Sequence, residues 1–238
     1  LYSGTATDTT SGYIGTSAFN SSYYDAMYVG YKYGTSGTLV SNRTNENNST
    51  IKTYIDNWYS TNLSSYTKYI STEAVYCNDR EVGSGTYTAT GSTKFYYASY
   101  TRLKTNKTPS YNCTNSKDAF SGSNTEAKLT YPIALMTADE VAYAGGVYET
   151  ELTRPYAWYS TNSNGENITE ESYYWWLLSP YYWDGDTVIP KCVYGLGLFG
   201  GSYAGEEFGV RPVISIKSDA IWSSGDGSSE NPYEIIYN

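Results

Sequence analysis

The strongest hydrophobic pattern in the chain lies in residues 49–59, where apolar and aromatic residues recur with the period of an α-helix. They fall at positions i, i+3, i+4, i+7 and i+8, and they are Ile51, Tyr54, Ile55, Trp58 and Tyr59. This spacing places all of them on one face, which typically packs against a core. Either Asn48 or Ser49 can cap the first turn. We therefore predict an amphipathic helix here.

A second pattern, in residues 131–146, predicts a strand followed by a helix. The run from Tyr131 to Met136 is almost wholly apolar, as in a buried strand. Thr137 and Glu140 have the spacing of a capping box, and Gly145 is placed to end a helix. This unit is the clearest local structure in the sequence.

Shorter patterns predict strands elsewhere, separated by long polar loops. The expected strands span residues 26–34, 69–76, 175–178, 188–194, 210–216 and 233–237, with a turn or linker at 223–232. Residues 95–103 are compatible with a strand or a short helix. The pattern indicates an α+β fold, with two main helices around small antiparallel sheets and long loops. We assign residues 1–22 to an N-terminal arm or edge segment and residues 23–238 to one domain.

Residues 173–212 combine two apolar ends with an interior that has little periodicity. The first end carries Trp175 and Trp176, the last carries Arg211 and Pro212, and the interior is rich in Tyr, Trp, Gly and Asp. Rigid strands that hold a long irregular aromatic segment are typical of binding surfaces. We therefore predict a ligand-binding segment at about residues 175–212, whose irregular interior contributes little to the core.

The composition favours a folded domain of an extracellular or cell-surface protein. Only 39% of the 238 residues are hydrophobic, but 17% are aromatic and 30 are Tyr, which argues against disorder. The net charge is −9 and the basic residues are scattered, so nucleic acid and anionic membrane surfaces are disfavoured partners. Charged residues make up 16%, and hydroxyl and amide side chains are abundant.

The absence of histidine restricts the chemistry that the chain can perform. It excludes Ser-His-Asp and Cys-His catalysis and removes the most common zinc ligand. Catalysis would have to use carboxylates, Tyr, Lys or Cys, and no paired Asp/Glu spacing supports a glycan-cleaving site. We therefore expect a protein that is not an enzyme and needs no cofactor.

The three cysteines permit at most one internal disulfide. We favour Cys77 with Cys113, because Cys192 lies inside the irregular segment; the alternative is three free thiols. The bridge would close a loop of about 35 residues and stabilise the fold by ~3–4 kcal/mol.

No apolar run approaches the ~18 residues of a membrane-spanning helix, and the sequence opens at Leu1 without a signal peptide. We therefore expect a mature or trimmed ectodomain that does not insert directly into a membrane.

Five short motifs occur in the same order as in a family of bacterial surface and pilin-associated proteins. They are Tyr-Cys-Asn-Asp-Arg at 76–80, Leu-Met-Thr-Ala-Asp-Glu-Val-Ala-Tyr-Ala-Gly-Gly at 135–146, Tyr-Trp-Trp-Leu-Leu-Ser-Pro at 174–180, Gly-Val-Arg-Pro-Val-Ile at 209–214 and Gly-Asp-Gly-Ser-Ser-Glu-Asn-Pro-Tyr at 225–233. Each motif is weak alone, but the ordered set is fairly specific. Residues 28–238 thus resemble this family.

That family in turn resembles the C-type-lectin fold, in the branch shared by formylglycine-generating-enzyme-like proteins and the variable proteins of diversity-generating retroelements. In the variable proteins, a Trp-rich strand and a terminal Gly-x-Arg-Pro-like strand frame a ligand-binding surface. The resemblance implies that any diversified positions lie within residues 181–208. It does not imply formylglycine-generating activity or calcium-dependent sugar binding, because the catalytic cysteines and the Glu-Pro-Asn or Gln-Pro-Asp motif have no counterpart.

The candidate ligand-binding residues lie in this interior, where Tyr and Trp would supply large rigid contact areas. They are Tyr181, Tyr182, Trp183, Asp184, Asp186, Tyr194, Phe199, Tyr203 and Glu206. For the aromatic members other than Tyr181, packing in the core is the open alternative. Trp175, Trp176 and Leu177 are assigned to the core.

Two further features of the interior have alternative interpretations. Asp184 and Asp186 are spaced like calcium ligands, and Glu206 and Glu207 could converge on them. Asp-Gly-Asp is also ordinary turn chemistry, so calcium is a weak candidate. Arg211 lies between apolar strand residues and is expected to pair with a carboxylate or carbonyl.

Three functions are compatible with these observations. The first is a non-enzymatic binding or adhesion protein, displayed on a bacterial surface, that binds a protein or glycan on another cell or host surface. The second is a structural, pilin-like filament subunit that assembles with copies of itself. The third is a carboxylate-based enzyme acting on glycans.

Overall fold

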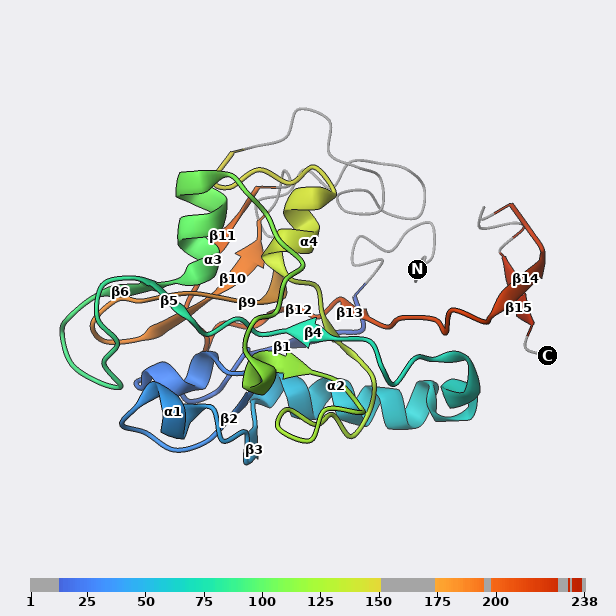
Figure 1. Ribbon diagram of the computed structural model, residues 1–238, viewed down its shortest axis with the longest axis horizontal. Coiled ribbons are helices and arrows are strands. Elements are labelled where there is room, and N and C mark those ends of the chain that lie inside the picture. The colour runs from blue at the N-terminus through green and yellow to red at the C-terminus, as the bar shows by residue number, and fades with distance from the viewer. Residues whose placement is uncertain (1–12, 151–173, 195–197, 227–230, 232, 237–238) are drawn as a thin grey trace.

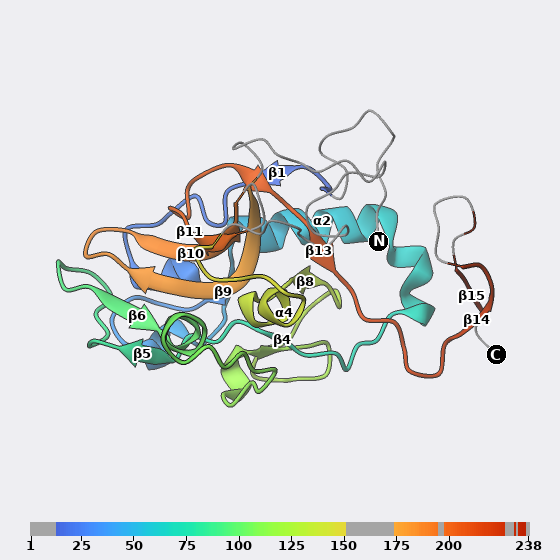
Figure 2. The same ribbon diagram turned by 90° about the horizontal axis from the view of Figure 1, so that it is seen from above.

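The computed structural model describes residues 13–150, 174–194, 198–226, 231 and 233–236. It is a mixed α and β structure with few helices and several small sheets. A seven-stranded sheet lies at the centre, with α2 on one face and α3 and α4 on the other (Figures 1 and 2). The β9–β10 hairpin tip and the C-terminal β14–β15 hairpin lie at opposite ends of the molecule.

Strand β9 is the centre of the main sheet. It pairs antiparallel with β10 along one edge, while its other edge pairs with β12 at Trp175 and with β6 at Tyr182 and Trp183. Strands β11, β1 and β5 extend the sheet from β10, β12 and β6. The seven strands are β1 Thr16–Ser17, β5 Val82–Ser84, β6 Phe95–Tyr97, β9 Trp175–Trp183, β10 Val188–Val193, β11 Phe199–Gly201 and β12 Phe208–Gly209.

The β9 strand supplies the core instead of a binding surface. Its side chains alternate between two hydrophobic clusters, with Trp176 and Leu178 on the α2 side and Trp175 and Leu177 on the α4 side. A strand covered on both faces becomes a nearly continuous apolar run. The assignment of Trp175, Trp176 and Leu177 to the core is therefore confirmed. The prediction that the interior of the segment contributes little to the core was wrong, because Trp183 and Phe199 are buried as well.

The predicted amphipathic helix is confirmed as α2, Thr50–Asn62. Ser49 caps it by accepting a hydrogen bond from the Lys52 backbone N–H. Ile51, Ile55 and Tyr59 are buried, and Tyr54 and Trp58 pack against the same cluster.

The capping box is also confirmed, at the start of α4, Ala138–Tyr143. The Glu140 backbone N–H donates to Thr137 Oγ1 at 3.1 Å, and the Thr137 backbone N–H donates to Glu140 Oε2 at 2.6 Å. The preceding strand is shorter than predicted, and only β8, Ala134–Leu135, pairs with β13, Pro212–Val213.

The predicted strand at residues 26–34 is divided between a short helix and a two-residue strand. Asp25 accepts a hydrogen bond from the Met27 backbone N–H and so caps a 3₁₀ helix, η1 Ala26–Val29. Local capping thus prevails over the apolar pattern. Of the predicted strand, only β2, Lys32–Tyr33, forms, and it pairs with β3, Asn47–Asn48. Of residues 69–76, only Tyr76 lies in a strand, β4 Tyr76–Cys77, which pairs with β7, Ala119–Phe120.

Residues 95–103 contain both predicted alternatives, since β6 leads directly into α3 and then into the π-helix η3. The remaining helical elements are single turns or short segments. Their bounds are α1 Leu39–Asn42, η2 Ser64–Tyr69, α3 Ala98–Tyr100, η3 Thr101–Asn106 and η4 Ser116–Asp118.

The described part of the N-terminal segment is built into the fold. β1 pairs with β12, Phe19 is fully buried, and the Ser17 carbonyl accepts a hydrogen bond from Trp176 Nε1 at 2.8 Å. At the other end, β14 Ile221–Ser224 and β15 Glu234–Ile236 form a hairpin that projects beyond the main body (Figures 1 and 2).

The favoured disulfide, Cys77–Cys113, is confirmed. The third thiol, Cys192, is free and fully buried in β10, where burial raises its pKa to about 12. No helix within the described residues has both the length and the apolar character that a membrane span requires.

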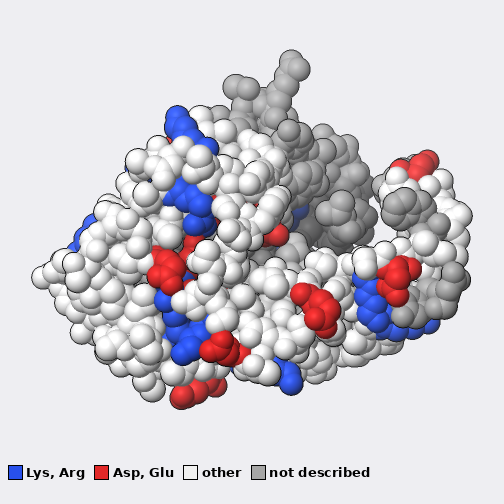
Figure 3. All heavy atoms as spheres, in the orientation of Figure 1, with Lys and Arg blue, Asp and Glu red and all other residues white. Residues whose placement is uncertain are grey.

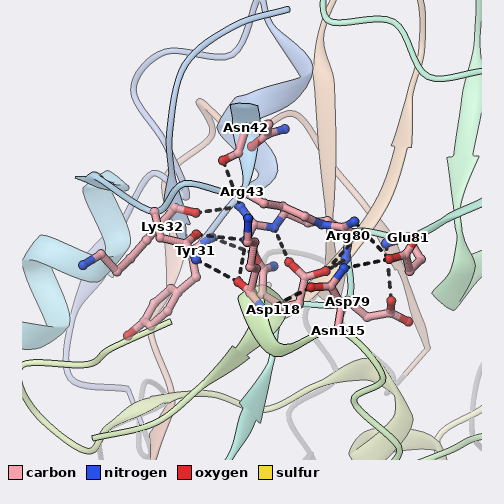
Figure 4. Close-up of polar contacts among 12 residues, drawn as sticks. Tyr31, Lys32, Asn42, Arg43, Asp79, Arg80, Glu81, Asn115 and Asp118 are labelled. Atoms are coloured by element: carbon pink, nitrogen blue, oxygen red, sulfur yellow. Dashed lines mark hydrogen bonds and ion pairs between the residues drawn. The ribbon is translucent and has the colours of Figure 1, made fainter. Parts of the chain in front are cut away.

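A buried ionic network joins the end of α1, the residues after β4 and the helix η4, and Figure 4 shows its residues. Arg80 is fully buried, and its Nε donates to Asp118 Oδ1 at 2.6 Å. Its other guanidinium nitrogens donate to Lys32 O, Asn42 O, Asn45 Oδ1 and Lys117 O. Arg43 lies 2.8 Å from the second Asp118 oxygen and 2.9 Å from Glu81. Two buried arginines therefore depend on one carboxylate.

We predict that Asp118→Asn lowers the free energy of unfolding by ~3–5 kcal/mol, because it leaves buried positive charge without its partner. Urea denaturation would measure the change. Lys104→Gln is the matched control, since the Lys104–Glu149 pair is 42% and 48% exposed, and it should cost less than about 1 kcal/mol. Equal effects of the two substitutions would contradict the role of the network.

Candidate functional site

An open cleft of about 320 Å³ lies at the tip of the β9–β10 hairpin. Three chain segments form it: the β9–β10 turn, the loop between β11 and β12, and the residues just before η1. The lining residues are Tyr23, Tyr24, Asp184, Asp186, Thr187, Tyr203, Gly205 and Glu206. Side chains far apart in the sequence thus share one surface.

The hairpin tip is held by the side chain of Asp184. Its Oδ1 accepts hydrogen bonds from the backbone N–H groups of Asp186 and Thr187, at 2.9 and 2.7 Å. Gly185 between them has φ +106°, a conformation that favours glycine. This Asx turn fixes Asp184 and leaves Asp186 exposed beside the cleft.

Tyr23 enters the cleft because a glycine makes room for its ring. A Cβ at Gly205 would lie 2.6 Å from the Tyr23 ring, so no other residue fits there without a shift. The Tyr23 carbonyl accepts a hydrogen bond from Val188 N at 2.9 Å, which ties this segment to β10. Tyr24 packs on Tyr23 with ring centroids 4.4 Å apart.

The cleft is acidic and aromatic. It contains three carboxylates and three tyrosines, and no Lys or Arg belongs to its lining. The Tyr24 hydroxyl donates a hydrogen bond to the Tyr23 hydroxyl, which raises the pKa of Tyr24, and the nearby Asp186 charge adds to the rise. Ionised carboxylates only accept hydrogen bonds. The cleft therefore suits a ligand that donates hydrogen bonds or carries positive charge, with a face for aromatic contact.

Four of the predicted site residues line this cleft: Asp184, Asp186, Tyr203 and Glu206. Of these, Tyr203 is 51% exposed, which makes it the most accessible aromatic residue of the predicted segment among those described. Asp186 and Glu206 are also exposed.

The other five predicted residues do not line the cleft. Trp183 and Phe199 are 1% exposed, and Trp183 Nε1 donates to the Gly91 carbonyl at 2.9 Å. Tyr181 is also buried, against Tyr148 and Tyr100. These three belong to the core because β9 and β11 are covered by helices and loops.

Tyr182 and Tyr194 are half-buried and occupied by contacts within the chain. The Tyr182 ring packs on Tyr96 and beneath Lys94 Nζ, 4.1 Å from the ring centroid. The Tyr194 hydroxyl bridges the Gly201 carbonyl and backbone N–H. Both side chains therefore contact other parts of the sheet region, and neither contributes to the cleft.

Four cleft residues were not predicted from the sequence: Thr187 and Gly205, which lie within the predicted segment, and Tyr23 and Tyr24, which lie far outside it. The signal for Tyr23 and Tyr24 was weak: two adjacent tyrosines in the polar stretch Asn20-Ser21-Ser22-Tyr23-Tyr24. Nothing in the sequence pattern indicates that this stretch lies beside the hairpin tip, because about 160 residues of sequence separate the two.

The calcium candidates are engaged as turn residues. The Asp184 oxygens accept three hydrogen bonds from Asp186 and Thr187. Within the described ranges, no three His, Cys, Asp or Glu side chains are grouped to hold a metal ion. Arg211, expected to pair with an oxygen acceptor, places its guanidinium over the Trp175 ring, with Cζ 4.9 Å from the centroid.

A buried lysine lies elsewhere in the sheet. Lys191 in β10 is fully buried, and its Nζ has no hydrogen-bond partner among the described residues. The nitrogen lies 4.2 Å from the Tyr181 ring centroid and 4.5 Å from that of Tyr148. Burial lowers its pKa to about 7, although Asp139, Cys192 and Glu149 oppose this shift. Lys191 does not line the cleft, so we expect a substitution of this residue to change the stability of the fold and not binding in the cleft.

We predict that Trp183→Ala lowers the free energy of unfolding by ~3–5 kcal/mol, because it opens a cavity in the core. Tyr203→Ala, in an exposed position, should change it by less than about 0.5 kcal/mol. Urea titration followed by near-ultraviolet circular dichroism would measure both. If Trp183→Ala were as mild as Tyr203→Ala, Trp183 would return to the candidate surface.

We predict a pH-dependent effect of Lys191→Met. Between the folded pKa of about 7 and the unfolded value of 10.5, the unfolded chain binds more protons at Lys191 than the native protein. From pH 7 to pH 9, the free energy of unfolding of the wild type should therefore rise by up to about 2 kcal/mol relative to that of the variant. The exposed Lys128→Met is the control. A difference that does not change with pH would show that Lys191 keeps its charge in the core.

The comparison with known families places most of the chain in one domain. Residues 35–218 match the family model described as a domain of unknown function, DUF6273. The match contains six of the eight cleft residues and excludes Tyr23 and Tyr24. No curated protein and no solved structure matches the chain. The chain therefore belongs to the DUF6273 family.

Proposed function

We propose that this chain is a non-enzymatic binding module that is displayed on a bacterial surface and binds a protein or glycan in the hairpin-tip cleft. One observation carries the proposal. Tyr23, Tyr24 and Tyr203 converge with Asp186 and Glu206 in an open cleft, although these residues come from three separate segments. Exposed tyrosines supply contact area at low entropic cost, and such residues are enriched in binding surfaces.

The exposure of the carboxylates favours binding over catalysis. A carboxylate pair that cleaves glycosidic bonds needs one acid kept protonated by an apolar environment. Asp186 and Glu206 are instead exposed to solvent. They suit ionic or hydrogen-bonding contact with a ligand that remains intact.

The C-type-lectin-like scaffold is part of the proposal. It is supported by a contact between the two ends of the predicted ligand-binding segment. The Gly209 backbone N–H donates to the Tyr174 carbonyl at 2.9 Å, so the two ends lie side by side. This arrangement agrees with the frame implied by the resemblance to variable proteins. If the segment is diversified, the exposed positions Asp186, Tyr203 and Glu206 can vary at little cost in stability.

The charge distribution supports a partner other than nucleic acid. On the face shown in Figure 3, Lys and Arg gather in a band left of centre and in a smaller group at the lower right, and in both places Asp and Glu lie among them, so no extended basic surface forms. Nucleic-acid surfaces need such a patch to neutralise phosphates. The Cys77–Cys113 disulfide supports an extracellular location, because disulfides persist in oxidising compartments.

The alternative function, a filament subunit, is favoured by the C-terminal hairpin. Ile221, Ile235 and Ile236 are 39–46% exposed on a two-stranded sheet that projects from the body (Figure 2). An isolated hairpin is marginally stable in water, so a neighbour that covers it would stabilise it. Assembly through this hairpin would leave the cleft free to bind a ligand.

We predict that the purified protein binds a limited set of ligands on combined glycan and protein arrays, and that Tyr203→Ala weakens this binding about tenfold or more. Asp186→Asn with Glu206→Gln should weaken it similarly, because both changes remove acceptor charge from the cleft. Tyr66→Ala, also an exposed tyrosine, and Glu46→Gln with Glu73→Gln are the matched controls. Biolayer interferometry at several salt concentrations would separate a cationic ligand, whose binding salt weakens, from a neutral glycan.

Two results would contradict the proposal. One is equal loss of binding in the cleft variants and in the controls. The other is an absence of array binding by a protein that light scattering shows to be a stable multimer, which would favour the filament subunit.

A further inference from the structure

A second hollow, which we call the neutral groove, lies between the N-terminal segment and the start of α2. It has a volume of about 470 Å³, within the ~300–1,000 Å³ range of ligand sites. One wall is the segment from Ser17 to Ser22, the other is the first two turns of α2, and Tyr33 and Asn48 close it. It shares no lining residue with the cleft.

Every residue that lines the groove is Ser, Thr, Asn or Tyr. The lining therefore carries no formal charge and no aliphatic side chain. A charged ligand would find no countercharge, and a peptide would find none of the apolar pockets that peptide grooves use. Hydroxyl and amide groups can both donate and accept hydrogen bonds. Such a surface matches a ligand made of neutral hydroxyl groups.

One residue of the groove wall carries a buried amide nitrogen that has no hydrogen-bond partner among the described residues. Asn20 is 2% exposed and lines the groove, and its Nδ2 forms no hydrogen bond within the described residues. Its backbone N–H donates to Ala204 O at 3.0 Å, and its Oδ1 accepts from Ser22 N at 3.4 Å, so the amide is held in place. Leaving a buried donor unsatisfied is costly, so this atom points to an acceptor supplied from outside.

Two tyrosines give the groove aromatic faces. Tyr54 is anchored by its hydroxyl, which donates to Ile14 O at 3.1 Å, and Tyr33 packs edge-on against Tyr28. Burial raises the pKa of Tyr33. Both rings are half-buried and so keep an accessible part. Fixed tyrosine rings beside hydrogen-bonding groups suit the apolar faces and hydroxyl edges of sugar rings.

We propose that the neutral groove is a binding site for a neutral oligosaccharide. Asn20 Nδ2 donates to a sugar oxygen, the exposed side chains of Thr53 and Asn57 contact neighbouring hydroxyl groups, and Tyr33 and Tyr54 contact the ring faces. The groove binds its ligand whether or not the cleft binds one, because the two sites are separate surfaces.

The test uses calorimetric and NMR titration of the full chain with maltohexaose, cellohexaose, laminarihexaose, mannohexaose and chitohexaose. At least one should bind below about 10 mM, and Thr53→Ala with Asn57→Ala should weaken it about tenfold. Thr61→Ala with Asn62→Ala is the matched control on the same helix. Thr61 and Thr53 each donate to a backbone carbonyl four residues earlier, so the control reproduces the helical effect of the change.

Asn20→Leu provides an independent measurement. It should abolish sugar binding with only a small change in melting temperature, since it removes a donor that has no hydrogen-bond partner among the described residues and one acceptor of a 3.4 Å hydrogen bond from Ser22 N. A lowered melting temperature with unchanged binding would assign Asn20 a purely structural role and overturn its part in the site.

Three further outcomes would overturn the proposal. The first is no binding of any of the five hexasaccharides. The second is binding that Asp186→Asn with Glu206→Gln weakens and that the groove variant does not, which would place the sugar in the cleft. The third is binding of a neutral Ser/Thr-rich peptide in place of the sugars, which would assign the groove to a protein partner.

Discussion

The need to pair one buried guanidinium organises much of this fold. Arg80 is fully enclosed, and its nitrogens reach Asp118, Asn45 and three backbone carbonyls from separate parts of the chain. A buried charge with no partner costs several kcal/mol, so these segments are stable only when assembled together. The preceding residues add further links: Cys77 forms the disulfide, Asn78 Nδ2 donates to Leu178 O at 2.7 Å, and Asp79 pairs with Arg102. These contacts give a structural role to four residues of the motif at 76–80.

The same network connects to the central sheet. The Asn78 amide accepts a hydrogen bond from Tyr31 N and donates to a carbonyl of β9, so the loop region and the sheet are fixed to each other. Strand β9 in turn is covered on both faces. Every side chain of β9 except the half-buried Tyr182 is buried, so the strand serves as the support of the hairpin tip. Binding residues on loops supported by a rigid scaffold are a common arrangement.

The N-terminal segment then becomes important in a way that its composition does not suggest. Ser17 to Ser22 form one wall of the neutral groove, and the next two residues, Tyr23 and Tyr24, line the acidic cleft. The segment is held between α2 and the sheet by Phe19, whose carbonyl accepts from Ile51 N, and by Asn20, which donates to Ala204 O. One short stretch therefore contributes to two surfaces of different chemistry, one acidic and one uncharged.

The sequence by itself determined the elements whose signals are local. The stripe of α2, the capping box of α4 and the apolar runs at the start of β9 and in β10 were evident from spacing, because helix periodicity and capping depend on neighbours within a few residues. The Cys77–Cys113 pair was favoured only because Cys192 lies in the irregular segment, and the structure decided it. Half of the cleft residues, Asp184, Asp186, Tyr203 and Glu206, were likewise among the predicted site residues. Only the tertiary structure decided which aromatics are core and which are exposed, since Trp183 and Tyr203 have similar local surroundings but differ in what packs over them. It also decided that Tyr23 and Tyr24 join the cleft, because pairing across about 160 residues depends on how the chain closes and leaves no local pattern.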